Sequence, residues 1–151
     1  MPAPRHSITR FRTQHVQVAA GSGVLALPMR KRGIDWRTTD IQPADIGLPP
    51  EQMPCQCDAL AALSRFGSEV DVVFWAWWIG HGEGDAELAD ECTRRQLPAL
   101  FVGEPRGGRT GSVALWERAQ VQPLSALLAG VDVPCWPDMQ DRTWIVEQAL
   151  L

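Results

Sequence analysis

The sequence predicts a three-layer α/β fold in which helices cover both faces of a mostly parallel sheet. Two runs that are apolar apart from Asp71, Val70–Trp78 and Ala99–Gly103, predict central strands because neither alternates between apolar and polar residues. Segments with helical patterning separate the strands. The clearest is Asp85–Gln96, which begins with acidic residues and ends with basic ones, as a helix dipole favours. Strands and helices therefore alternate along the chain, which is typical of a parallel sheet.

The first third of the chain predicts a strand, a helix and a second strand. His15–Ala20 predicts a short buried strand, and the segment Val24–Arg32 that follows it is typical of a helix. Pro28 requires this helix to start just before it or to kink, because proline is tolerated only in a first turn. Gly33 then indicates the helix end, and Ile34–Thr39 is the second strand.

The rest of the chain continues the alternation. Residues 42–54 are rich in proline and predict a loop. After it we expect helix Ala59–Phe66 with Asp58 as N-cap, then the strand, helix and strand named above, a glycine-rich turn at Pro105–Gly111, helix Val113–Gln120, and a closing pair of strands within Gln122–Cys135 and Thr143–Gln148.

The length and the net charge of the chain limit the classes of function that it can have. The chain has 151 residues, which suits a single domain, here 15–151, preceded by a loose polar and basic arm at 1–14. The net charge of −4 disfavours nucleic acid as a partner. No run of 18 apolar residues predicts a membrane span, and no hydrophobic signal core is evident, so we expect a cytoplasmic protein. The four cysteines match no metal-ligand spacing, so we expect free thiols and no metal.

The turn after the first strand invites two interpretations. Gly21 and Gly23 allow a sharp turn and a close approach of backbone to a ligand, and Asp40 follows at the end of the second strand. A carboxylate there can accept hydrogen bonds from the hydroxyls of a ribose. Gly21-Ser-Gly23-x-x-Ala26 also satisfies a loosened dinucleotide fingerprint. The alternative is a tight turn beside an unrelated surface aspartate.

Taken together, several short motifs resemble those of the Rossmann-like S-adenosylmethionine-dependent methyltransferases. They occur in the family's order from Val16 onward: Val18–Gly23, Asp40, Asp58-Ala59, Ala76–Ile79, Phe101–Glu104, Gly107–Gly111 and Asp141-Arg142. The most specific part is Val102-Gly-Glu104 followed by Gly107-Gly-x-Thr110-Gly111. The resemblance implies a three-layer, Rossmann-like methyltransferase fold with a mostly parallel sheet and a C-terminal antiparallel strand pair.

The resemblance also implies roles for individual residues. S-adenosylmethionine would be the cofactor, and the methyl acceptor is not identified. The cofactor-binding residues would be Ala20, Gly21, Ser22 and Gly23 at the methionine portion, Asp40 at the ribose, Asp58 and Ala59 at the adenine, and Trp77 near the methyl group. The catalytic candidates are Trp78, which could shape the acceptor pocket, and His81, which could accept a proton.

Each of these candidates also has a structural interpretation. Strict alternation would put Trp75 and Trp77 on one face of the strand and Trp78 on the other, and such aromatic residues most often pack in cores. His81, flanked by glycines, could equally be a solvated loop residue. Arg109 could meet an anionic group or only occupy a turn.

Departures from the family pattern keep other functions open. Gln17 stands where many members carry an acid, Ala19 stands at the first glycine, and Trp78-Ile79 replaces an expected proline pair. These changes favour a catalytically inactive binding or structural subunit as the alternative. A dinucleotide-binding oxidoreductase is the weaker alternative. A homo-oligomer is a further expectation, because seven tryptophans in so small a chain could leave an apolar patch.

Overall fold

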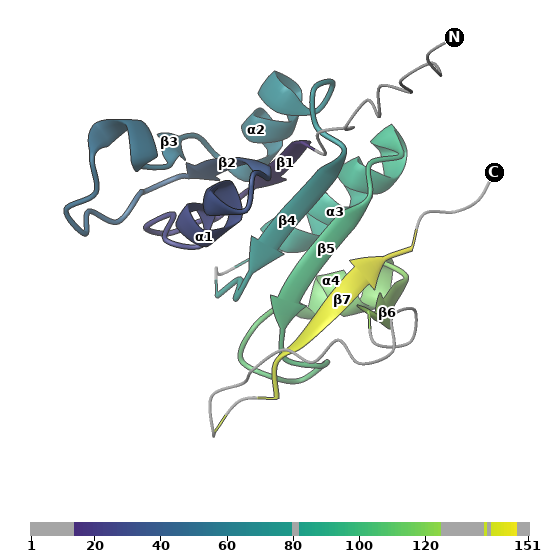
Figure 1. Cartoon of the computed structure of the whole chain (residues 1–151). Helices are drawn as coiled ribbons and strands as arrows, with labels where there is room; N and C mark the ends of the chain where they lie inside the picture. The colour runs from purple at the N-terminus through teal and green to yellow at the C-terminus, as the bar shows by residue number, and fades with distance from the viewer. Residues whose placement is uncertain (1–13, 80–81, 125–137, 139, 148–151) are drawn as a thin grey trace, which may run out of the picture.

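The protein is built around a single seven-stranded sheet in strand order β3-β2-β1-β4-β5-β7-β6 (Figure 1). The computed structural model describes residues 14–79, 82–124, 138 and 140–147. Helix α1 covers one face of the sheet, and α2, α3 and α4 lie against the other, with α3 in contact with both α2 and α4 (Figure 1). The predicted three-layer arrangement is confirmed.

The first half of the chain forms one edge of the sheet. Its elements are β1 (Gln14–Gln17), α1 (Ala26–Lys31), β2 (Asp35–Asp40), the 3-10 turn η1 (Pro50–Gln52), β3 (Cys55–Gln56) and α2 (Ala59–Phe66). Strand β1 pairs in parallel with both β2 and β4, and β2 pairs in parallel with β3. The carboxyl ends of these strands therefore meet along one edge of the sheet.

The second half completes the sheet. Its elements are β4 (Val72–Ala76), α3 (Gly84–Arg95), β5 (Ala99–Gly103), α4 (Val113–Arg118), β6 (Val121–Pro123) and β7 (Arg142–Val146). Strands β4 and β5 are parallel, whereas β7 runs antiparallel to both β5 and β6. The mostly parallel sheet and the antiparallel pair near the C-terminus are both as predicted. No helix among the described residues is long and apolar enough to cross a membrane.

Strands β1 and β4 both end earlier than predicted, and each ends where the backbone turns left-handed. Strand β1 ends at Gln17 rather than Ala20, because Ala19 has a φ of 49°. Strand β4 ends at Ala76 rather than Trp78, because Trp77 has a φ of 52°. Neither alanine nor tryptophan favours this region, so the residue types give no warning of the turn.

The predicted helices differ from the observed ones only at their ends. Helix α1 begins at Ala26, so Pro28 lies in its first turn, where its missing N–H costs nothing. Gly33 follows the helix with a φ of 78°, as its predicted role requires. The side chain of Asp58 caps α2 by accepting a hydrogen bond from the Ala61 amide at 2.9 Å.

Two predicted segments include residues that lie outside the part of the chain that the structure describes. These are the arm, of which only Gln14 is described, as the first residue of β1, and most of the predicted strand at 122–135. Strand β6 covers only its beginning.

An aromatic cluster fixes the second half of the sheet. The rings of Trp75 and Phe101 stack with centroids 5.2 Å apart, and Trp116 meets Trp144 edge-on at 4.9 Å. Trp75 is 1% exposed, so the core interpretation holds for this tryptophan. The cluster ties β4, β5 and β7 to α4, and it thereby holds the loops that follow β4 and β5.

Candidate functional site

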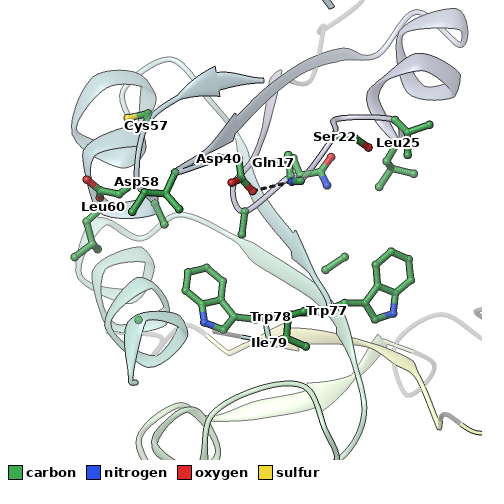
Figure 2. A pocket seen from close by; sticks show the side chains of 18 of the residues that line it. Gln17, Ser22, Leu25, Asp40, Cys57, Asp58, Leu60, Trp77, Trp78 and Ile79 are labelled. Atoms are coloured by element: carbon green, nitrogen blue, oxygen red, sulfur yellow. Dashed lines mark hydrogen bonds between the residues drawn. The ribbon is translucent and has the colours of Figure 1, made fainter. Parts of the chain in front are cut away.

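A pocket of about 780 Å³ opens where the carboxyl ends of β1, β2 and β4 meet (Figure 2). Open parallel sheets bind their ligands at this edge. The lining residues come from four segments of the chain and from α3: Gln17, Ala19, Ala20, Gly21, Ser22, Val24, Leu25, Asp40, Ile41, Cys57, Asp58, Ala59, Leu60, Ala76, Trp77, Trp78, Ile79, Gly84 and Glu87. Of the ten residues singled out from the sequence, eight are among them, Gly23 is not, and His81 lies outside the described residues.

The loop after β1 forms one wall of the pocket through its backbone. The Ala20 amide donates to the Thr39 carbonyl at 3.0 Å, which ties the loop to β2. Gly21 has a φ of 57°, and a Cβ built on it would meet nothing within 4 Å. The loop therefore leaves open space at Gly21, which its lack of a side chain makes available to a ligand.

Asp40 holds this loop in place. One carboxylate oxygen accepts the Gly21 amide at 2.7 Å, and the other accepts the Gln42 amide at 2.8 Å. Hydrogen bonds to a carboxylate are stronger than those between neutral groups. Asp40 thus shapes the glycine loop in addition to facing the pocket, a role that the spacing of these residues did not suggest.

Asp58, Ala59 and Cys57 form the wall contributed by β3 and α2. Because one oxygen of Asp58 caps the helix, the carboxylate is held at the pocket edge. The Cys57 amide donates to the Asp40 carbonyl at 2.9 Å, so this wall is tied to β2 as well. Burial, and next the nearby Asp58 charge, raise the pKa of the Cys57 thiol, which keeps it in the neutral form.

Trp77 and Trp78 line the pocket from the loop after β4, and their rings point to opposite ends of it (Figure 2). Trp78 points toward the end that holds Asp58 and Leu60, and Trp77 toward the end that holds Leu25. The predicted alternation of faces fails here, because the chain leaves the strand at Ala76.

The two tryptophans are held differently. The Trp78 ring lies against Gly84 at the start of α3, where an added Cβ would come within 2.9 Å of it. Trp77 is 45% exposed, and its indole N–H donates to Asp141 at 2.9 Å. Trp78 is therefore wedged between the pocket and α3, whereas one side of Trp77 faces open space.

Two of the predicted site residues are not brought to the pocket by the described structure. Gly23 has a φ of 76°, but a Cβ there would lie 2.9 Å from the Pro54 side chain, so Gly23 provides room for the facing loop. His81 lies outside the described residues, and its place relative to the pocket stays a prediction.

Two polar lining residues were not predicted as site residues: Gln17, noted from the sequence only as a departure from the family pattern, and Glu87. Gln17 is 4% exposed, and its side-chain oxygen accepts the Trp36 indole N–H at 2.9 Å. This bond uses one of the two lone pairs of the oxygen and leaves the amide N–H donors of Gln17 for other partners. Glu87 lines the pocket from α3, one turn after Gly84. Glu87 could have been found from the sequence, because it lies in a predicted helix only three residues after Gly84, and so close to the predicted site.

The most specific motif of the resemblance has a structural role. One Glu104 oxygen accepts the Arg109 amide at 2.6 Å, and the Glu104 amide donates to the Thr110 hydroxyl at 2.7 Å. The buried Asp85 of α3 accepts the Ser112 amide at 2.7 Å. These bonds fold the glycine-rich turn onto itself and onto α3, and none of these residues lines the pocket.

No cluster of three metal-ligating side chains occurs within the part of the chain that the structure describes. Cys55, Cys57 and Cys92 are free thiols.

Solved structures with the same fold exist. The chain is similar to the crystal structure of a mutant of MtNAS in complex with S-adenosylmethionine, with a TM-score of 0.51 and 13% sequence identity. Together with the strand order, this likeness shows that the chain has a Rossmann-like fold. The alignment covers 92% of this chain and 57% of the other, so the chain spans little more than half the length of that structure.

A second crystal structure of the same MtNAS mutant aligns over 92% of this chain and 55% of its own, with 13% identity and a TM-score of 0.46. No protein-family model and no curated protein sequence matches the chain. The likeness is therefore one of fold.

Proposed function

We propose that this protein binds S-adenosylmethionine in the pocket and transfers its methyl group to an acceptor. The observation that carries the proposal is the hydrogen bond from the Gly21 amide to Asp40, which joins the loop after β1 to the end of β2 at the pocket. This is the corner of an α/β sheet that holds a nucleoside. A structure of the same fold, although only 13% identical, is in complex with S-adenosylmethionine, and this supports the proposal.

The pocket residues fit the chemical groups of this cofactor. Asp40 already accepts two backbone amides, and the remaining lone pairs of its carboxylate can accept from ribose hydroxyls. Asp58 can accept from the amino group of adenine, with Ala59 beside it. The backbone of Ala20, Gly21 and Ser22 lines the part of the pocket proposed for the methionine portion.

The protein's own contribution to methyl transfer would be alignment and shielding. The bound cofactor supplies an electrophilic methyl group, which needs no covalent help from a side chain. Trp77 and Trp78 can exclude water from the space between methyl group and acceptor, and fixing both reactants accounts for much of the rate. We retain Trp78 and His81 as the proposed catalytic residues, with His81 as the proton acceptor.

The alternative function is a binding or structural subunit without catalysis, and the state of Gln17 favours it. Its side chain is neutral and its oxygen already accepts from Trp36, so this position offers a ligand two N–H donors and one further lone pair where the family's acid would offer a negative charge. A cofactor ammonium group would therefore bind more weakly to glutamine than to a carboxylate. Under this alternative the pocket would bind S-adenosylhomocysteine weakly or not at all.

Calorimetric titration with two ligands tests the proposal. One ligand is S-adenosylhomocysteine, and the other is a reduced nicotinamide dinucleotide, which the oxidoreductase alternative would bind. We expect Leu60→Glu to weaken S-adenosylhomocysteine binding about tenfold, because it replaces an apolar wall beside Asp58 with a charge. Val113→Glu is the matched control: it also replaces an apolar side chain with glutamate in the first turn of a helix, α4, at an exposed residue that does not line the pocket.

The outcomes separate the candidate functions. Binding of S-adenosylhomocysteine that Leu60→Glu weakens and Val113→Glu leaves intact supports the proposal. Preference for the dinucleotide would favour the oxidoreductase, and absence of binding to either would favour the structural subunit.

A further inference from the structure

Exposed apolar side chains gather around the pocket. The large hydrophobic residues that are exposed in the described structure are Val24, Ile41, Ile46, Leu60, Trp77, Ile79 and Val113, and all but Ile46 and Val113 line this pocket. Exposed apolar side chains that share one pocket are typical of a binding site.

Trp77 differs from the other apolar residues in how firmly it is held. Its φ of 52° lies in the left-handed region, where a bulky side chain is a genuine outlier. Its backbone amide donates to the Val102 carbonyl at 2.8 Å, and its indole N–H donates to Asp141, which is 3% exposed. Strained residues persist only where the surrounding structure holds them, and they cluster at ligand sites. The ring is thus fixed in orientation while nearly half of the residue stays exposed.

Charge is unevenly distributed over the pocket wall. The charged lining residues are Asp40, Asp58 and Glu87, which come from β2, the start of α2 and α3. The lining residues within 17–25 and 76–79 include none with a charge. Trp77 and Leu25 lie on the same side of the pocket, away from Asp58 (Figure 2). The Asp141 carboxylate that binds the Trp77 indole is only 3% exposed and is not a lining residue. Because the lining here offers a ligand no charged partner, an uncharged ligand portion is favoured over a charged one.

We propose that the exposed face of Trp77 is a platform on which the methyl acceptor stacks, and that the acceptor is a small molecule with a flat, uncharged aromatic ring system. The assignment deepens the proposed methyl transfer and rests on it. Asp141 is a positioning residue, which acts by holding the indole ring in place.

The test uses three probes at pH 7, each titrated calorimetrically with and without saturating S-adenosylhomocysteine: 2-naphthol, which is flat and neutral; 2-naphthoate, which is flat and anionic; and cyclohexanol, which is neutral but not flat. We expect 2-naphthol to bind tightest. Trp77→Leu should weaken its binding by about five- to a hundredfold, the range for loss of an aromatic stacking partner, and Trp77→Phe should weaken it less. Ile46→Ala, a change at an exposed apolar residue outside the pocket, should leave it unchanged.

Asp141 is tested by comparison of two variants. Asp141→Asn keeps an acceptor oxygen for the indole N–H and should retain 2-naphthol binding, whereas Asp141→Ala should weaken it about fivefold or more. The near-ultraviolet circular dichroism of the tryptophans should change only in the alanine variant. Equal binding by both variants would overturn the role of Asp141.

The remaining outcomes test whether Trp77 is the platform on which the acceptor stacks. Unchanged 2-naphthol binding in Trp77→Leu, or equal affinity for 2-naphthoate or cyclohexanol, would overturn it. If S-adenosylhomocysteine does not bind the wild-type protein, the proposed function fails, and the titrations without it still decide whether Trp77 binds a flat neutral ring.

Discussion

Replacement of Asp40 by asparagine should lower stability as well as ligand binding. Both carboxylate oxygens accept backbone amides, one from Gly21 in the pocket and one from Gln42 at the surface. In Asp40→Asn one oxygen becomes an NH₂ group, which would face an N–H donor, and the other bond loses its charge assistance. The variant therefore removes one of the two bonds and weakens the other.

The size of the effect follows from the burial of the two bonds. A hydrogen bond to a charged group contributes about 1.5–3 kcal/mol, and the lower value applies here because the Gln42 bond is exposed and the Gly21 bond only partly buried. For a domain of this length, about 1.5 kcal/mol corresponds to a fall in melting temperature of about 3–6 °C. Thermal unfolding followed by tryptophan fluorescence measures it.

Asp45 provides the matched control. Its carboxylate accepts the Gly47 amide at 2.8 Å within an exposed turn. Asp45→Asn therefore makes the same chemical change at an exposed position, and the free energy of unfolding should change by no more than about 0.5 kcal/mol. Equal melting temperatures for Asp40→Asn and wild type, or equal shifts for the two variants, would refute the role given to Asp40. Titration with S-adenosylhomocysteine well below the melting temperature then measures the loss of binding separately.

Three further predictions concern the rest of the fold. Ala19→Gly should raise the melting temperature by about 2 °C, because glycine relieves the left-handed strain at a φ of 49°; a fall would show that the strain is absent. Gly23→Val should lower stability by about 1–3 kcal/mol in urea denaturation, because its Cβ would overlap the Pro54 side chain; normal stability would contradict this close contact. Glu91→Gln should cost about 1 kcal/mol at pH 7, and urea titrations at pH 7, 5 and 3.5 should show this difference shrinking, whereas a difference independent of pH would contradict it.

The sign of the Glu91 prediction comes from its hydrogen bonds. Bonds from Arg94 and then Arg95, at 2.6–2.7 Å, lower the pKa of the Glu91 carboxyl to about 2. A pKa that is lower in the folded state than in the unfolded state stabilises the fold above the unfolded value. That contribution is lost as the pH falls from about 4.5 through about 2, and the partial exposure of the pair limits its size.

The sequence predicted most of the elements because their signals are local. The apolar run of β5, the N-cap of α2 and the helix stop at Gly33 each depend on residues that are neighbours in the chain. The ends of β1 and β4 could not be predicted in the same way. The left-handed turns at Ala19 and Trp77 are imposed by contacts with other strands, such as the bond from the Trp77 amide to Val102.

The same distinction applies to the pocket. Residues of the glycine loop and Asp40 could be singled out because glycines and a strand-end acid have a characteristic spacing. Gln17 could not be assigned a partner, since its bond to Trp36 joins residues 19 apart, and Gly23 could not be told from its neighbour Gly21. The two glycines have similar φ values and differ only in what lies opposite them: open space for Gly21, and Pro54 for Gly23.

The most specific motif of the resemblance, Glu104 and the glycine-rich turn after it, is therefore evidence for the fold. The less specific motifs supply the residues that line the pocket. Glu104 and the glycine-rich turn after it bind one another and, through Ser112, the buried Asp85. Such bonds would be needed by an active enzyme and by an inactive subunit alike, because they fix the turn after β5 and tie it to α3. The turn also supports the loop after β4, because the Gly111 amide donates to the Trp78 carbonyl at 2.9 Å. The residues proposed to meet the ligand are nevertheless Asp40 and Trp77, which line the pocket, whereas Glu104 and the turn do not. Retention of the motif thus argues for the fold, and only ligand binding at Asp40 and Trp77 separates the two functions.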